Sequence, residues 1–358
     1  MTSNAAESIT LSQAGALIAT MAHEQSLLLL SAPGVGKSDL INQTAAAAGL
    51  ECRSLLGTQI APEDVSGVPR IVGERTVFCP PRVLLPEDPA PFCLFLDELP
   101  ASAPDVQKAF YSLLLERRIG EYRLPPGSWV VAAGNRAEDR ALVRALSSAL
   151  VNRVVILNVR VDLREWLMWA RANGIRSDIQ AFVVFQPQAL ARPVPAEPVP
   201  FSTPRAWASL SRALDLVEQK GIMDIALRRA LAFGRVSAQD AAVYCALAEH
   251  NVTTPQPLEA YLNGTARLPE DDSARWFVLN WIREELSRRL QEHDLTHYDY
   301  VNEGPFTVES VTPEQVNTFL LSLPQEHRFA LLVDMIEVWS QLGADQSLLQ
   351  SLVELTGI

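Results

Sequence analysis

The chain has 358 residues and a net charge of −12, and 48% of its residues are hydrophobic, which is typical of a globular protein with two or three domains. No apolar run approaches the roughly 20 residues of a membrane-spanning helix, and the first residues lack the features of a signal peptide. We therefore expect a cytoplasmic protein that does not engage a membrane. The four cysteines form no C-x-x-C pair, which disfavours a disulfide framework or a zinc site.

A glycine-rich turn lies near the start of the chain, between a predicted strand over 27–30 and a predicted helix over about 37–48. The turn reads Ser31-Ala-Pro-Gly-Val-Gly-Lys-Ser, which matches the phosphate-binding loop G-x-x-x-x-G-K-[ST] except at its first glycine. The chain has three lysines against 27 arginines, so a lysine in this turn suggests a need for a compact ammonium. The alternative is an ordinary strand-turn-helix junction.

If the turn binds a nucleotide, its residues have distinct roles. Lys37 reaches the β- and γ-phosphates, and the Ser38 hydroxyl ligates Mg²⁺. The backbone N–H groups of the turn close around phosphate oxygens, helped by the positive N-terminal end of the helix. The turn residues expected to surround the phosphates are Pro33, Gly34, Val35 and Gly36.

The first half of the chain alternates predicted strands and helices, which predicts an α/β fold with a parallel sheet covered by helices on both faces. A helix is expected over 102–118, with Ser102 as its N-cap. Between 67 and 78, two short β-like runs flank Gly73, which predicts a hairpin inserted into this core. Such a hairpin suits contact with a partner or simple packing. The further strands are expected over 51–56, 92–96, 129–133 and 154–157.

Polar residues lie at the ends of three of these strands. Asp97 and Glu98 end the strand over 92–96, some 60 residues after the glycine-rich turn, where the first acid can position Mg²⁺ and the second can activate water. Asn135 follows the next strand, where its amide can orient that water or merely close a turn. Arg153 precedes the last strand and is a candidate to act on ATP held by a neighbouring subunit, with an intramolecular ion pair as the alternative.

After residue 161 the patterns are helical. Six prolines between 187 and 204 predict a stiff linker, and Arg205 begins the next helix, from which it can touch the γ-phosphate or lie on the helix surface.

Residues 270–358 hold 16 acidic residues, five arginines and no lysine, so this region has a net charge of −11 and suits nucleic acid poorly. His293 and His297 stand four apart, a weak metal-site pattern in an otherwise polar stretch. The predicted helices are about 205–218, 223–232, 238–250, 273–291, 313–322, 326–341 and 346–355.

Taken together, these motifs resemble an AAA+ ATPase, most closely the MoxR-type (dynein-related AAA_5) branch, over roughly residues 10–265. In this resemblance the turn is Walker A and the segment ending at Asp97-Glu98 is Walker B. Asn135 falls at the sensor-1 position, Arg153 matches the arginine finger, and Arg205 matches the sensor-2 arginine. Ser31 and the acidic extension after about residue 268 depart from the pattern.

The resemblance implies an ATPase core over residues 1–190 with the inserted hairpin at about 60–80, a helical lid over 191–268 and an acidic helical extension over 269–358. It also implies ATP and Mg²⁺ as cofactors and a ring-shaped homo-oligomer, commonly a hexamer. The implied work is chaperone-like remodelling of a protein client, often with a partner that carries a von Willebrand factor A domain.

Two other functions stay open from the sequence. A nucleic-acid motor of the AAA+ class would need a basic surface, which the near-neutral core and acidic extension disfavour. A non-catalytic nucleotide-binding module is the other alternative, and Ser31 is the feature that favours it.

Overall fold

The structure is a computed structural model that describes residues 7–82, 84–85, 90–119, 121–136, 139, 146–249, 256–292, 313–324, 327–328 and 331. The chain forms two compact units, each with its own core. The first comprises Met1–Glu165, Pro193–Pro198 and Thr203–Arg205, and the second comprises Trp166–Arg192, Val199–Ser202 and Ala206–Ile358. The division into an ATPase core, a lid and an extension stays a prediction.

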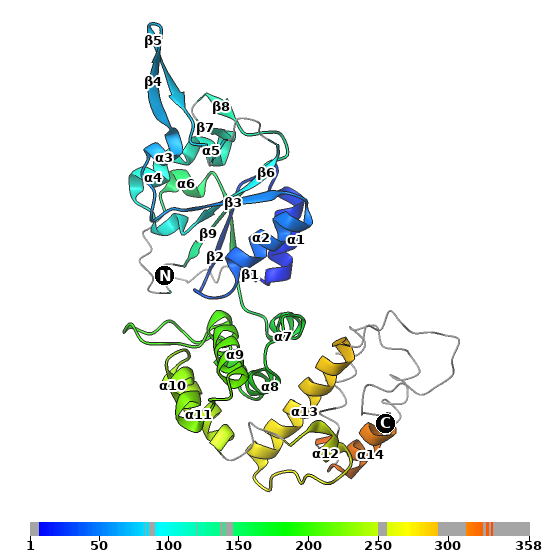
Figure 1. The fold of residues 1–358 in the computed structure, drawn as a ribbon. Helices are drawn as coiled ribbons and strands as arrows, with labels where there is room; N and C mark the ends of the chain where they lie inside the picture. The colour runs from blue at the N-terminus through cyan, green and yellow to red at the C-terminus, as the bar shows by residue number, and fades with distance from the viewer. Residues whose placement is uncertain are drawn as a thin grey trace, which may run out of the picture. The chain divides into compact units, whose positions relative to one another are not determined.

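A six-stranded parallel sheet forms the centre of the first unit, which confirms the predicted fold class (Figure 1). In this sheet the strand that ends at Ser31 pairs with the strand that ends at Asn135, so that these two residues lie opposite each other. Because all strands run in one direction, the strand ends that bear Ser31, Asp97 and Asn135 share one edge of the sheet. In spatial order the strands are β1 (Ser8–Ile9), β10 (Val155–Val159), β2 (Leu27–Ser31), β9 (Trp129–Asn135), β6 (Phe92–Asp97) and β3 (Glu51–Leu56).

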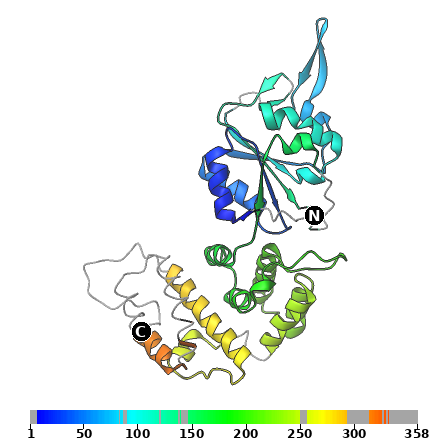
Figure 2. The same ribbon diagram turned by 180° about the vertical axis from the view of Figure 1, so that it is seen from behind.

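Two hydrophobic cores cover the two faces of the sheet, because successive side chains of a strand point to opposite faces. Leu27 and Leu29 pack with helices α1 (Leu11–Met21) and α2 (Lys37–Ala47) on one face. Leu28 packs on the other face with four shorter helices (Figures 1 and 2). These helices are α3 (Glu63–Ser66), α4 (Pro104–Ala109), α5 (Tyr111–Glu116) and α6 (Ser148–Val151).

The helix expected over 102–118 is wrong in two respects. It is divided at Phe110 into α4 and α5, and its N-cap residue is Ala103, with Pro104 at the first helical position. Ser102 instead ends a short 3-10 helix (η1, Leu99–Ala101), where its hydroxyl donates to the carbonyl of Leu99 at 2.6 Å. The hydroxyl therefore closes the preceding turn and is not free to cap the next helix.

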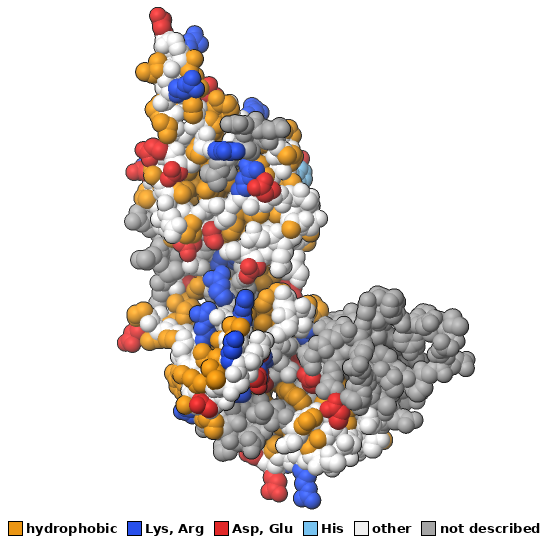
Figure 3. All heavy atoms as spheres, viewed as in Figure 1, with side chains coloured by type: hydrophobic (Ala, Val, Ile, Leu, Met, Phe, Trp, Pro, Cys, Tyr) orange, Lys and Arg blue, Asp and Glu red, His pale blue; other side chains and the backbone are white. Residues whose placement is uncertain are grey.

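The predicted hairpin is confirmed as β4 (Val68–Val72) and β5 (Arg75–Cys79), which project from the rest of the first unit (Figure 1). Its turn needs Gly73, which has φ 63°. Apolar side chains lie open to solvent along the hairpin, and Ile71 is 79% exposed. Figure 3 shows hydrophobic and charged side chains together on this projection. A second, unpredicted hairpin pairs β7 (Arg118–Ile119) with β8 (Tyr122–Arg123).

The second unit is helical, as the sequence predicts, although α12 was not expected. The helices predicted over 326–341 and 346–355 lie almost wholly outside the described residues, and so do His293 and His297. Among the helices that the structure describes, none is both long and apolar enough to cross a bilayer. The elements from the end of the sheet onward are α7 (Leu163–Ala172), α8 (Ser177–Phe185), η3 (Pro187–Ala189), α9 (Pro204–Gln219), α10 (Ile225–Phe233), α11 (Ala238–Glu249), α12 (Leu258–Leu262), α13 (Asp272–Glu292) and α14 (Pro313–Ser322).

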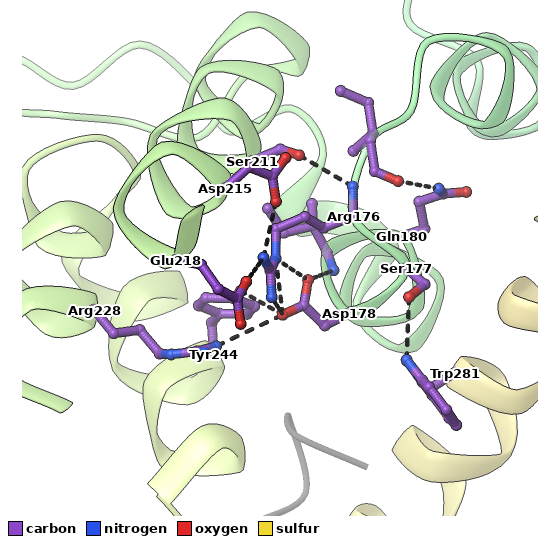
Figure 4. A network of polar contacts seen from close by, with 12 residues as sticks. Arg176, Ser177, Asp178, Gln180, Ser211, Asp215, Glu218, Arg228, Tyr244 and Trp281 are labelled. Carbon is purple, nitrogen blue, oxygen red and sulfur yellow. Dashed lines mark hydrogen bonds and ion pairs between the residues drawn. The ribbon is translucent and has the colours of Figure 1, made fainter. Parts of the chain in front are cut away.

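A polar network holds the helices of the second unit together around Arg176 (Figure 4). The Arg176 guanidinium contacts Asp178 at 3.1 Å and reaches α9 through Asp215 at 2.9 Å. Asp178 in turn accepts a hydrogen bond from the hydroxyl of Tyr244 on α11 at 3.1 Å. The indole of Trp281 on α13 donates to Ser177 at 3.1 Å. Since buried charges need partners, this network fixes how the four helices pack.

Candidate active site

The turn between β2 and α2 is a tight loop that depends on two glycines. Gly34 has φ 76° and Gly36 has φ 111°, backbone conformations that side-chain-bearing residues rarely adopt. Gly36 is also the N-cap of α2, so the helix begins at Lys37. Val35 is 5% exposed and packs in the core beneath the loop, which anchors it from below. The predicted phosphate-binding loop is therefore formed at a helix N-terminus.

Lys37 points back along the loop to the edge of the sheet. Its ammonium lies 2.8 Å from Ser31 Oγ, and 3.3 Å from each of the carbonyl oxygens of Ser31 and Ala32. A fourth oxygen, Asn135 Oδ1, lies 3.3 Å away on the neighbouring strand. The ammonium thus links the loop to the strand that ends at Asn135.

Burial lowers the pKa of Lys37 to about 8. Asp97 and Asp139 oppose this effect by favouring the charged form, whereas Arg205 and Arg136 add to it. A desolvated ammonium beside a surface of loop N–H groups is suited to bind an anion.

Ser38 and Asp97 form an oxygen pair beside this ammonium. Ser38 Oγ donates to Asp97 Oδ2 at 3.2 Å, while Asp97 Oδ1 accepts the backbone N–H of Glu98 at 3.0 Å. Hydroxyl and carboxylate oxygens are the donors that Mg²⁺ prefers, and it commonly takes only one or two protein ligands besides substrate phosphates and water. The described residues contain no group of three or more His, Cys, Asp or Glu side chains that could hold a metal ion.

Glu98 has an unusual backbone. Its φ is 54° and ψ is 32°, the left-handed region, where a residue other than glycine is strained. Its carboxylate accepts a hydrogen bond from the Thr58 hydroxyl at 3.2 Å. Thr58 follows β3, the strand that pairs with β6. The strained turn directs Glu98 along the edge of the sheet near Asp97, where a general base is expected.

Asn135 ends β9 and is followed by a paired arginine. The Arg136 guanidinium holds Asp139 through two hydrogen bonds, of 2.9 and 3.0 Å. Asn135 itself accepts from Lys37, so the predicted sensor amide and phosphate-binding lysine are brought together.

Arg153 lies apart from this group. Its guanidinium is 4.8 Å from the centre of the Tyr111 ring and donates to the carbonyl of Ala149 at 2.7 Å. Among the residues that the structure describes, Arg153 makes this cation–π contact and backbone hydrogen bond and has no ion pair. Its role across a subunit interface stays a prediction.

Arg205 contacts the loop through its own backbone N–H group. Its N–H donates to the carbonyl of Gly34 at 3.1 Å, and its side chain is exposed. Thr203 packs on the same glycine so closely that a Cβ added at Gly34 would lie 2.6 Å from the Thr203 hydroxyl. Thr203 therefore leaves no room for a side chain at position 34, so its contact with the loop requires glycine there.

Three residues of this site escaped the sequence analysis: Thr58, Tyr111 and Thr203. Thr58 had one usable signal, since it follows the strand predicted over 51–56, which in the structure pairs with the strand before Glu98. Tyr111 and Thr203 had none, because their partners are distant in sequence and the contacts depend on packing.

Residues 26–159 match the family described as AAA domain (dynein-related subfamily). This stretch includes the loop, Asp97, Glu98, Asn135 and Arg153. The matched domain supports an ATPase that uses ATP with Mg²⁺.

Among solved structures, the Holliday junction branch migration motor RuvB of Thermotoga maritima is 15% identical, covers 71% of this chain and 74% of its own, and has a TM-score of 0.39. NtrX from Brucella abortus is 15% identical, covers 96% of this chain and 67% of its own, and has a TM-score of 0.38. No curated protein matches the chain.

Proposed function

We propose that this ATPase assembles into a ring, commonly of six copies, and uses hydrolysis at subunit interfaces to remodel or activate a protein client. It would be a MoxR-type AAA+ protein that works with a partner bearing a von Willebrand factor A domain. The observation that supports the catalytic part best is the meeting of Lys37, Ser38, Asp97 and Asn135 at one edge of the sheet. Ring, client and partner are supported by the resemblance of the motifs.

Each residue of the site has a proposed role in hydrolysis. The loop from Pro33 to Gly36 wraps the phosphates with backbone N–H groups, and Lys37 neutralises the β- and γ-phosphates. Ser38 and Asp97 would hold Mg²⁺, which when bound neutralises charge on the phosphate oxygens.

The attacking water needs a base and an orienting group. Glu98, held by Thr58 at 3.2 Å, accepts the proton of this water, and Asn135 orients it against the γ-phosphate. Asp97 lies next in sequence and stays engaged with Ser38, so the two acids have separate tasks.

Two arginines would stabilise the charge that develops on the transferring phosphoryl group. Arg153 would act on the ATP of the neighbouring subunit from its position over the Tyr111 ring. Arg205 would report the nucleotide state to the helices of the lid, since its own N–H is bonded to Gly34 of the loop.

The projecting β4–β5 hairpin is our candidate for client contact. Val68, Ile71 and Val72 are each more than half exposed on it. A solvated apolar surface of this kind marks an interaction site more often than a scattered single residue does. Shortening the hairpin between Val68 and Cys79 should leave ATP turnover intact and abolish client remodelling; remodelling that persists would refute this assignment.

The test of the ATPase ring is hydrolysis measured against protein concentration for wild type, Glu98→Gln, Arg153→Ala and a mixture of the two variants. We expect turnover that rises with concentration, because the site is completed across an interface. Each variant alone should be nearly inactive. In the mixture, some interfaces join an intact Glu98 to an intact Arg153, so part of the turnover should return.

The outcomes separate the parts of the proposal. Turnover that is independent of concentration and of Arg153 would remove the shared interface site while leaving the ATPase. Turnover unchanged in Glu98→Gln would remove the assigned base. Salt-sensitive DNA binding by the assembled protein would favour the nucleic-acid motor over client remodelling.

A further inference from the structure

Ser31 stands where phosphate-binding loops have glycine, and in this structure its side chain is the nearest partner of Lys37. We propose that the Ser31 hydroxyl is a positioning group that holds the Lys37 ammonium ready for the phosphates of ATP. This inference rests on the proposed nucleotide site and adds a residue to it. The departure from the glycine pattern would then be a working part of this site and not a sign of lost activity.

The hydrogen-bond directions support this role. A hydroxyl has one proton and two lone pairs, and the Ser31 proton is directed to the carbonyl of Ala32 at 2.8 Å. The lone pairs are thereby left for a donor, and the Lys37 ammonium lies 2.8 Å away. Ser31 therefore acts as an acceptor for a charged donor, which makes the stronger kind of hydrogen bond.

The surroundings of the ammonium show why this one acceptor matters. Lys37 has three protons and four oxygen neighbours, and the three oxygens other than Ser31 Oγ all lie at 3.3 Å. With glycine at position 31, only these long contacts would remain. When a phosphate oxygen arrives, the ammonium can give up a long contact and keep the short one.

The contact between the Ser31 hydroxyl and the Lys37 ammonium is shielded from water. Ser31 has no exposed surface, so water does not readily replace its hydroxyl. In the β2–β9 pairing Ser31 lies opposite Asn135, whose Oδ1 approaches the same ammonium from the neighbouring strand. Two paired strand ends thus hold Lys37 between them. A side chain held in place before binding loses less rotational freedom when the ligand arrives.

The test compares Ser31→Ala, which removes only the hydroxyl, with Ser31→Gly, which restores the family glycine. Full-length protein is titrated with a non-hydrolysable ATP analogue and with ADP, each with Mg²⁺. We expect both variants to bind the ATP analogue about 5- to 30-fold more weakly than wild type, because a charge-assisted hydrogen bond is lost. The loss for ADP should be smaller, because ADP lacks the γ-phosphate that Lys37 also reaches.

Steady-state kinetics add a second measurement. KM for ATP should rise with the dissociation constant, while kcat at saturation stays within about threefold, as expected for lost binding that substrate and transition state share. Thermal unfolding without nucleotide controls for damage to the fold. If Ser31→Ala does not fold, Ser31→Gly tests the same loss of the hydroxyl.

The results that would overturn the proposal differ from those that would overturn the nucleotide site. If wild type binds and both variants bind equally well, Ser31 does not position Lys37 and the site stands. Wild-type affinity in Ser31→Gly with weak binding in Ser31→Ala would show that backbone freedom matters and the hydroxyl does not. Equal losses for ATP analogue and ADP would also contradict the proposal. Absence of binding by wild type would reject the nucleotide site itself.

Discussion

The side chains of Ser38 and Asp97 meet at 3.2 Å although 59 residues separate them in the sequence. Ser38 lies in the first turn of α2 and Asp97 at the end of β6, two strands away from β2 in the sheet. A parallel sheet brings such ends to one edge, where a hydroxyl and a carboxylate can share one cation.

The first prediction concerns this pair and its metal. Ser38→Ala should raise the Mg²⁺ concentration for half-maximal hydrolysis at least about tenfold, because one oxygen ligand is removed. A Mg²⁺ titration of ATP turnover measures it. Ser38→Thr keeps the hydroxyl and serves as the control. Chelation of Mg²⁺ should stop turnover in wild type and in Ser38→Thr. Equal Mg²⁺ requirements for wild type and Ser38→Ala would contradict the assignment of Ser38.

Thr58 should matter for the rate of hydrolysis and little for binding. Thr58→Val is nearly isosteric but cannot donate to Glu98, so the carboxylate loses the bond that holds it at 3.2 Å. We expect kcat to fall about 3- to 10-fold with KM for ATP nearly unchanged, as for a group that orients a general base. Thr58→Ser keeps the hydroxyl and should stay close to wild type. Thr58→Val with wild-type kcat would show that Glu98 needs no such support.

Tyr111 should support Arg153 through its aromatic face. Tyr111→Phe keeps the ring 4.8 Å from the guanidinium, whereas Tyr111→Leu removes the cation–π contact, worth about 0.5–2 kcal/mol at such a partly buried position. Tyr111→Phe also removes the hydrogen bond to Ser147, so it controls for that loss. We expect ATP turnover to fall about 2- to 5-fold in Tyr111→Leu and to hold in Tyr111→Phe. Equal turnover in the two variants would count against a role for the ring.

The hydrogen bonds to the Asp240 carboxylate lead us to expect that the stability of the protein depends on pH. Asp240 is fully buried at the start of α11, and its carboxylate accepts from Arg192, Ser202 and Ser237. Burial acts to raise the pKa of Asp240, but these hydrogen bonds outweigh it and lower the pKa below its usual value. The carboxylate therefore adds stability above about pH 4, its pKa in the unfolded chain, and loses it as the pH falls through the lower folded value.

The measurement is thermal unfolding of wild type and Asp240→Asn between pH 7 and pH 3. At pH 7 the variant should be less stable by about 3 kcal/mol, because Arg192 loses its charged partner. The difference should shrink as the pH falls below about 4, because Asp240 then takes up a proton in the unfolded chain before it does so in the folded protein. Asp272→Asn, at a carboxylate of the same unit that is 82% exposed, is the control. A difference that stays constant with pH would show that charge on Asp240 does not contribute.

Much of the site was open to prediction from the sequence because its residues belong to short motifs or to strand ends. The loop from Ser31 to Ser38 has its glycines where positive φ angles are needed, and local geometry alone requires that. Apolar strands followed by acids or an amide indicated a shared sheet edge for Asp97, Glu98 and Asn135. Helix boundaries were less secure: the turn at Phe110 and the bond from Ser102 to Leu99 depend on tertiary packing.

The sequence by itself determined the parallel α/β core, the projecting hairpin, the helical character of the rest and the residue types that handle phosphate and metal. Local periodicity and turn chemistry are sufficient for these features. Only the tertiary structure decided that Ser31 is the nearest partner of Lys37, that Thr58 holds Glu98, and that Thr203 packs on Gly34. Each of these contacts joins side chains whose distance is set by strand register and core packing, and neither quantity is written in a local stretch of sequence.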